Sequence, residues 1–143
     1  MTLRFLLDTS IVSAPMAREP SAAITRRLAR HAAECAIAAP VWHELVYGCR
    51  RLPRGRRRAA LEAYLEQVVG PAFPILPYDE AAAAWHGAER ARLERLGTPA
   101  PHVDGQIAGI ARSAGLVLVT TNTRHFSRFS GLQLADWSGR VGR

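Results

Sequence analysis

Four side chains with oxygen donors occur at widely separated points of the sequence, each next to an apolar segment. Asp8 directly follows the apolar run 4–7, and Glu44 follows the run 35–39. Asp104 precedes the run 116–119, and Asn122 comes shortly after it. Carboxylates repel one another, so gathering three of them costs free energy unless a cation neutralises their charge. Hard oxygen ligands without histidine or thiolate suit Mg²⁺ or Mn²⁺, and such an ion supports hydrolysis of phosphodiester bonds.

The elements that must bring these residues together are predicted from the apolar pattern. Short apolar runs bounded by proline, glycine or acidic residues predict buried strands. Helical patterns separate these runs, so strands and helices alternate along the chain. The predicted strands are 4–7, 35–39, 73–76, 116–120 and 132–134. This order predicts an α/β fold, a single three-layer α/β/α domain over residues 1–143 with a parallel sheet covered on both faces.

The predicted fold places the acids at one edge of the sheet. Open α/β sheets bind ligands beyond the carboxyl ends of their strands. Asp8 lies at the end of the first strand, and Glu44 is expected in the first turn of a helix that begins at Pro40. Asp104 is expected near the start of its helix. Taken singly, Glu44 or Asp104 is explained equally well as an acid that complements the positive end of a helix, but an acid like Asp8 directly after an apolar strand has little structural purpose.

Composition limits the class of protein without deciding its function. The chain has 143 residues, 48% of them hydrophobic, which suits one folded domain. The N-terminus does not resemble a secretory signal and no apolar run is long enough to cross a membrane, so we expect a cytoplasmic protein. The net charge is +7 and every basic residue is arginine. This favours a nucleic-acid partner, although a GC-rich genome also explains the use of arginine.

Four ordered motifs give the sequence a recognisable resemblance. They are Leu-Leu-Asp-Thr-Ser at 6–10, His-Glu-Leu-Val-Tyr-Gly at 43–48, Asp-Gly-Gln-Ile-Ala at 104–108 and Val-Thr-Thr-Asn-Thr-Arg-His-Phe at 119–126. In this order they resemble the PIN-domain family, and within it they look most like the VapC toxins of bacterial toxin–antitoxin pairs. Gly-Leu at 131–132 and Asp-Trp at 136–137 match the usual tail of such proteins. The resemblance spans nearly the whole chain.

The resemblance implies a fold, an activity and partners. The fold is a central parallel sheet of about five strands, and the activity is cleavage of RNA by a water that Mg²⁺ or Mn²⁺ activates. Asp8, Glu44 and Asp104 would bind the metal, a small antitoxin protein would block the site, and the chain would form a homodimer. Many relatives carry a fourth acid where this chain has Asn122. Asparagine can hold a metal-bound water but adds no charge, so a second cation should bind more weakly and catalysis by one metal ion stays open.

Residues next to the acids have a functional and a structural interpretation. Thr9, Ser10 and Thr120 can orient a water or a phosphate, or they can cap the adjacent helices. His43 is adjacent to Glu44, but neighbouring helical positions point about 100° apart and a metal-activated water needs no further base, so we do not expect it to be catalytic.

Two further features were interpreted from residue type and spacing. Arg50, Arg51, Arg54 and Arg56 lie in a basic turn, and contact with RNA, contact with the antitoxin and simple solvation are all compatible with it. Cys35 and Cys49 are isolated from each other and from any Cys/His cluster, which favours packing over a disulfide, a zinc site or a redox role.

Two other functions are compatible with parts of the sequence. An aspartyl phosphotransferase or dehalogenase-like enzyme would use Asp8 as a nucleophile. Such enzymes usually carry an acid near the nucleophile, where this chain has Ser10, and a late lysine, which it lacks. A non-catalytic PIN-like module that binds RNA or protein is the second rival. The three retained acids argue against it, and Asn122 argues weakly for it.

Overall fold

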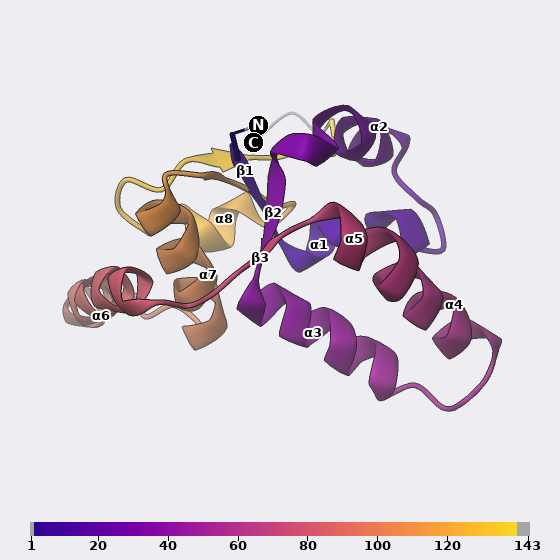
Figure 1. The fold of residues 1–143 in the computed structure, drawn as a ribbon. Coiled ribbons are helices and arrows are strands. Elements are labelled where there is room, and N and C mark those ends of the chain that lie inside the picture. The colour runs from indigo at the N-terminus through magenta and orange to yellow at the C-terminus, as the bar shows by residue number, and fades with distance from the viewer. Residues whose placement is uncertain (1, 140–143) are drawn as a thin grey trace.

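The computed structural model describes residues 2–139 as a parallel sheet flanked by helices (Figure 1). The strands are β1 (Phe5–Leu7), β2 (Cys35–Ala38), β3 (Ile75–Leu76), β4 (Val117–Val119) and β5 (Leu134–Ala135). Their order in the sheet is β3-β2-β1-β4-β5, and all four pairs are parallel. The predicted α/β fold with five parallel strands is therefore confirmed.

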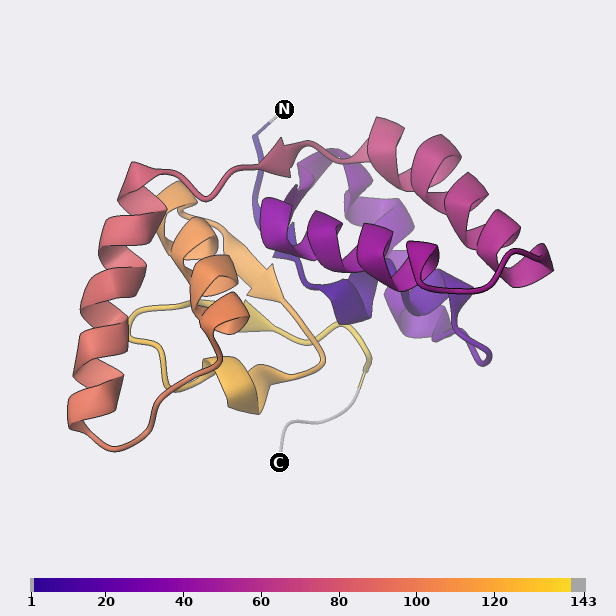
Figure 2. The ribbon, with the colours of Figure 1, turned by 90° about the horizontal axis from the view of Figure 1, so that it is seen from below.

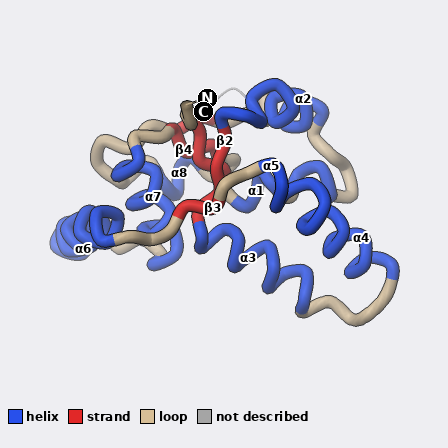
Figure 3. The backbone as a smooth tube through the Cα atoms, viewed as in Figure 1, coloured by secondary structure: helices blue, strands red, loops and turns tan. Residues whose placement is uncertain are grey.

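Helices make up most of the chain (Figure 3). The α-helices are α1 (Thr9–Val12), α2 (Ala22–His31), α3 (Ala39–Arg50), α4 (Arg56–Tyr64), α5 (Gly70–Ala72), α6 (Glu80–Arg95), α7 (His102–Ala114) and α8 (Thr123–Phe126). Two short 3₁₀ segments, η1 (Ala14–Met16) and η2 (Ala32–Glu34), and one π segment, η3 (Leu65–Val69), complete the described elements. Figure 2 shows the strands between two groups of helices, α6 and α7 on one side and α1 to α4 on the other.

The central strands are buried because both faces of the sheet are covered. Every residue of β1 and β2 is buried, and in β4 Val117 alone is partly exposed, as expected of a parallel sheet between two helical layers. Phe126 of α8 and Trp137 belong to the same core. Within the described residues, no helix is both long and apolar enough to cross a membrane.

Several predicted boundaries were wrong by a few residues. The last strand forms at Leu134–Ala135 and not at 132–134. Residues 50–58, whose composition predicts a basic turn, form a shorter one, since α3 extends to Arg50 and α4 already begins at Arg56. Leu61, Tyr64, Leu65 and Val68 have the spacing of one buried helical stripe, but Val68 is 51% exposed, whereas Val69 is buried. The wider π turn at η3 advances the buried stripe by one residue.

Candidate metal and nuclease site

The register of the sheet brings Asp8 and Thr120 together. Leu7 of β1 is the register partner of Val119 of β4, so the next residue of each strand emerges at the same edge. The hydroxyl of Thr120, which is fully buried, donates a hydrogen bond to Oδ2 of Asp8 at 2.8 Å. Asp8 itself is only 8% exposed. This edge is formed by the carboxyl ends of the strands, where the sequence analysis expected the site.

Two further hydrogen bonds fix the loop that follows β4. Oγ1 of Thr120 accepts a hydrogen bond from the backbone N–H of Asn122 at 3.0 Å. Oγ of Ser10 accepts one from the backbone N–H of Thr121 at 3.2 Å. Ser10 and Thr120 therefore attach this loop to the junction of β1 and α1, and they do not cap helices as their structural interpretation proposed.

The side chains of Asp8 and Asn122 remain available for a ligand. Each residue occupies the N-cap position of a short helix, Asp8 before α1 and Asn122 before α8. In the described chain, neither side chain makes the hydrogen bond to the backbone that a capping residue normally makes. The side chain of Asn122 is also exposed. Although both residues stand at N-cap positions, neither side chain acts as a helix cap.

Asp104 lies close enough to Asp8 for their charges to interact. It is half-buried in the first turn of α7, as predicted. Burial raises the pKa of Asp104, and the negative charge of Asp8 raises it further. The positive charges of His125 and Arg128 act in the opposite direction on this pKa. The carboxyl ends of the sheet therefore carry a pair of acids whose charges are only partly compensated.

His125 and Arg128 were not identified as neighbours of the site from sequence. The available signal was the spacing: His125 is three residues after Asn122, about one helical turn along α8.

Glu44 is placed apart from this acidic pair. It lies in the second turn of α3 and not in the first, and its side chain is exposed. Complementing the positive end of the helix therefore does not explain it. Among residues 2–139, the structure brings no group of three or more His, Cys, Asp or Glu residues close enough to hold a metal ion. The repulsion between carboxylates opposes the approach of a third acid to Asp8 and Asp104.

Glu44 nevertheless faces the region between α1, α3 and α7. It borders one hollow shared with Thr9 and Ser13 near α1, and a second shared with Val103 and Gln106 on α7. Val103 directly precedes Asp104, and Gln106 follows it by two residues. Glu44 and the first turn of α7 therefore border the same hollow.

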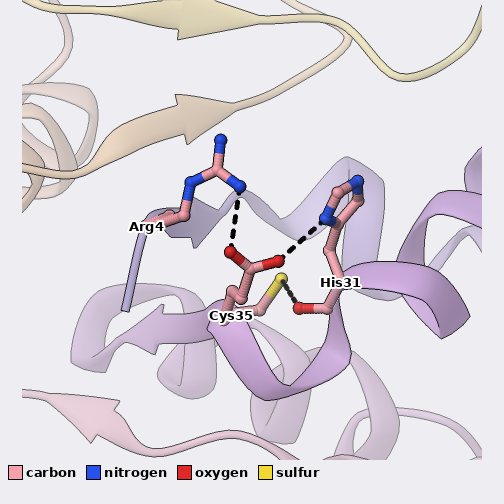
Figure 4. A network of polar contacts seen from close by, with 4 residues as sticks. Arg4, His31 and Cys35 are labelled. Carbon is pink, nitrogen blue, oxygen red and sulfur yellow. Dashed lines mark hydrogen bonds and ion pairs between the residues drawn. The ribbon is translucent and has the colours of Figure 1, made fainter. Parts of the chain in front are cut away.

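The opposite edge of the sheet contains a second polar network of a different kind (Figure 4). Glu34 accepts a hydrogen bond from Arg4 at 2.9 Å and pairs with His31 at 3.1 Å. These two contacts lower the pKa of Glu34, that with His31 more strongly. The Sγ of Cys35 donates to the carbonyl of His31, and burial raises the pKa of this thiol to about 12. Every acid here has a basic partner, which is typical of a structural network.

The donor chemistry at the carboxyl edge fits a divalent cation. Asp8 and Asp104 supply carboxylate oxygens, Asn122 an amide oxygen, and Glu44 a further carboxylate at the rim. Burial and, to a smaller extent, the negative charge of Asp8 raise the pKa of Asp104, and a hard cation bound here would favour its charged form.

Comparisons with known proteins point to one family. The family model for the PIN domain matches residues 5–132. The "tRNA(fMet)-specific endonuclease VapC" of Shigella flexneri is 37% identical over 137 residues, covering 95% of this chain and 99% of that protein. The protein of the same name from Salmonella typhimurium is 35% identical over 94% of this chain and 98% of its own length. The structure is similar to that of DNA-bound VapBC from Salmonella typhimurium, with a TM-score of 0.81 and 34% identity over 94% of this chain and 98% of that one.

Proposed function

Because the chain belongs to the PIN-domain family and its relatives are VapC ribonucleases, we propose that it is a metal-dependent endoribonuclease, the toxin of a toxin–antitoxin pair. The observation that carries this proposal is the pair formed by Asp8 and Asp104 at the carboxyl edge of the sheet. Burial and mutual repulsion oppose the charge on Asp104, and no structural ion pair offsets it in the described chain. A site of this kind is suited to bind a cation.

In the proposed mechanism, Asp8, Asp104 and Glu44 would hold Mg²⁺ or Mn²⁺, with Asn122 as an outer ligand through a water. When bound, such a cation would supply an activated water and positive charge to offset that of the scissile phosphate. Thr120 keeps the carboxylate of Asp8 in one orientation, since its hydroxyl donates to Oδ2.

Positive groups beside the acids have a separate part in the mechanism. His125 and Arg128 lie near enough to Asp104 to lower its pKa, so they can also attract a phosphate to the same edge.

The proposed partners are an RNA substrate, a small antitoxin protein and a second copy of the chain. The relatives' names make tRNA(fMet) the first RNA to test. The antitoxin has a suitable surface in the mostly apolar groove between α1, α3 and α4, which Leu45, Leu61 and Leu65 line and which Glu44 borders. A partner that fills this groove would cover Glu44 and so block the site.

Cleavage of labelled tRNA(fMet) with Mg²⁺ or Mn²⁺, with and without EDTA, tests the proposal. We expect Asp8→Asn and Asp104→Asn to abolish cleavage, and EDTA to abolish it in the unchanged protein. Asp79→Asn is the matched control, because Asp79 caps α6 and asparagine is an equally good N-cap. The non-catalytic alternative is correct if the protein binds RNA under all of these conditions but cleaves none of a panel of tRNAs, ribosomal RNA fragments and messenger RNAs.

A further inference from the structure

The turn between α3 and α4, together with the helix ends beside it, carries almost all of the net charge of the protein. Residues 50–58, here called the hairpin tip, contain six arginines and no acid. The rest of the chain contains 13 arginines and 12 acids, so it is close to neutral. The hairpin tip projects away from the sheet at the far end of α3 (Figures 1 and 2).

Most arginines of the hairpin tip make no ion pair or side-chain hydrogen bond within residues 2–139. Arg58 is the exception, since it donates to Glu62 at 2.7 Å and to the carbonyl of Leu52. Arg50, Arg54 and Arg56 are exposed, and none of them forms an ion pair with a carboxylate anywhere in residues 2–139.

A hollow in the hairpin tip is bordered by three of its arginines. Arg50, Arg54 and Arg58 line it with Glu62. The pKa of Glu62 is lowered mainly by its hydrogen bond from Arg58 and to a smaller extent by the charges of Arg50 and Arg54. Three cations around one acid leave an excess of positive charge in a concave surface.

The start of α4 places its arginines against the helix dipole. Its first turn contains Arg56, Arg57 and Arg58 and no acid, although the N-terminus of a helix favours negative charge. Arg58 gains an ion pair with Glu62 within the helix, but Arg56 and Arg57 have no carboxylate partner in the described chain. For these two, a local rule is broken without a structural gain, which is typical of a functional surface.

The hairpin tip is connected to the candidate site by one face of α3. Glu44, Tyr47 and Arg51 are spaced i, i+3 and i+7, so they lie along the same side of this helix. Tyr47 is 56% exposed, and the Arg51 guanidinium lies over its ring at 5.9 Å from the centroid. At 1.5 Å per residue, Arg51 is roughly 10 Å from Glu44 along the helix axis.

We propose that the hairpin tip is a phosphate-binding extension of the nuclease site. Arg50, Arg54 and Arg56 hold backbone phosphates of the RNA at a distance from the scissile bond, and Tyr47 stacks on an unpaired base between them and Glu44. This inference rests on the proposed ribonuclease function.

RNA matches the charge of this surface, because the hairpin tip contains six arginines and no acid and a nucleic-acid backbone offers a regular row of phosphates. Tyr47 is the one large exposed apolar residue of the described chain on the α3–α4 hairpin, and its ring offers a base a stacking surface beside these arginines.

The test is the salt dependence of RNA binding by the full-length chain. Fluorescence anisotropy with labelled tRNA(fMet) is measured between 50 and 200 mM KCl in the Asp8→Asn background, which prevents cleavage. The triple variant Arg50→Gln/Arg54→Gln/Arg56→Gln removes three proposed contacts, each worth about 0.7 in the slope of log K against log salt. We expect the slope to become shallower by about 2, so that the affinity of the variant falls roughly 18-fold less over this salt range.

A matched control separates local contacts from total charge. Arg26→Gln/Arg27→Gln/Arg30→Gln removes three exposed arginines from α2, on the segment that leads into the amino end of β2. We expect its slope to equal that of the parent. In the otherwise unchanged enzyme, the triple variant of the tip should raise KM for cleavage and leave kcat unchanged, because the lost contacts are made before and during the reaction.

Three results would overturn the inference. The first is a tip variant whose slope equals that of the parent. The second is an equal change of slope in the two triple variants. The third is a tip variant that binds RNA normally but loses affinity for a labelled polyglutamate peptide. If circular dichroism shows that the triple variant is unfolded, Arg54→Gln alone, in the exposed turn, should still reduce the slope by about 0.7. Absence of cleavage by the unchanged protein would contradict the proposed function, and the anisotropy experiment would still decide on the hairpin tip.

Discussion

The hydroxyl of Thr120 is the most specific feature of the site that a substitution can test. It is fully buried, donates to Asp8 at 2.8 Å and accepts from the N–H of Asn122 at 3.0 Å. Thr120→Val keeps the shape of the side chain but removes both hydrogen bonds. We expect the variant to be less stable than the unchanged protein and to cleave RNA more slowly.

The magnitude follows from the two contacts. A hydrogen bond to a charged acceptor contributes about 1.5–3 kcal/mol, and the N–H of Asn122 is near the surface, where water replaces its partner at little cost. The expected loss in the free energy of unfolding is therefore about 2–3 kcal/mol. With an unfolding entropy of about 2.1 cal/mol/K per residue over the 143 residues, this loss lowers Tm by roughly 7–10 °C.

Thermal unfolding followed by circular dichroism in EDTA measures this effect. Thr120→Ser is the matched control: it keeps the hydroxyl and loses one buried methyl group, which costs about 1 kcal/mol or roughly 3 °C. We expect the serine variant to keep most of its nuclease activity and the valine variant to lose most of it.

A double-mutant cycle assigns the effect to the contact itself. Combining Thr120→Val with Asp8→Ala should reveal a coupling energy above about 1 kcal/mol, because each single change already removes the shared hydrogen bond. The reasoning is refuted if the coupling is below about 0.5 kcal/mol, or if the valine variant unfolds at the same temperature as the serine variant.

Three further predictions concern a glycine, an acid and a thiol. A Cβ on Gly105 would overlap the buried imidazole of His86, so Gly105→Ala should destabilise the protein by about 1–3 kcal/mol. Gly87→Ala, with open space around it in α6, should stabilise by about 0.5–1 kcal/mol, and equal urea midpoints for both variants would contradict the packing argument. Since burial and a neighbouring carboxylate raise the pKa of Asp104, ionisation of Asp104 destabilises the metal-free fold as pH rises from the ordinary aspartate pKa through the raised value. In EDTA, Asp104→Asn should therefore have a higher Tm than the unchanged protein at pH 7 and a similar Tm near pH 3; a lower Tm at pH 7 would show that no such repulsion exists. The pKa of Cys35 is raised to about 12, so its thiol should not react with Ellman's reagent at pH 8 until the protein unfolds, and rapid labelling of the native protein would contradict this.

The sequence predicted the strands well because the sheet is buried on both faces. A run such as residues 116–119 has no polar alternation, and only a covered parallel strand or a buried helix accommodates it. The π turn at η3 was not predictable, because nothing in the pattern around Val68 and Val69 distinguishes a five-residue turn from an ordinary one. The expected position of Glu44 was wrong for a different reason: a helix that begins at Ala39 or at Pro40 has Glu44 as its sixth or fifth residue, already beyond a first turn of 3.6 residues.

The candidate site was predicted in part, and the missing part depends on tertiary contacts. Asp8 and Asp104 were expected at one edge of the sheet, and the structure pairs them electrostatically. The contact between Thr120 and Asp8 requires the register of β1 with β4, two strands separated by more than 100 residues. The order β3-β2-β1-β4-β5 makes β1 and β4 neighbours, and the apolar pattern of a strand does not specify its neighbours.

The two charged regions of the molecule can both function only if they stay apart. Arg92 shows what happens otherwise, since it pairs with Glu89 through two hydrogen bonds and leaves neither charge available for a ligand. An arginine of the hairpin tip that formed an ion pair with Asp8 or Asp104 would compete with a cation, whereas Arg128 lies near Asp104 without pairing with it in the described chain. Along α3, roughly 10 Å separate Glu44 from Arg51, slightly more than the Debye length of about 8 Å at physiological ionic strength. At this separation the acids can still bind a metal ion and the arginines can still bind phosphate, while a single RNA strand is long enough to reach both.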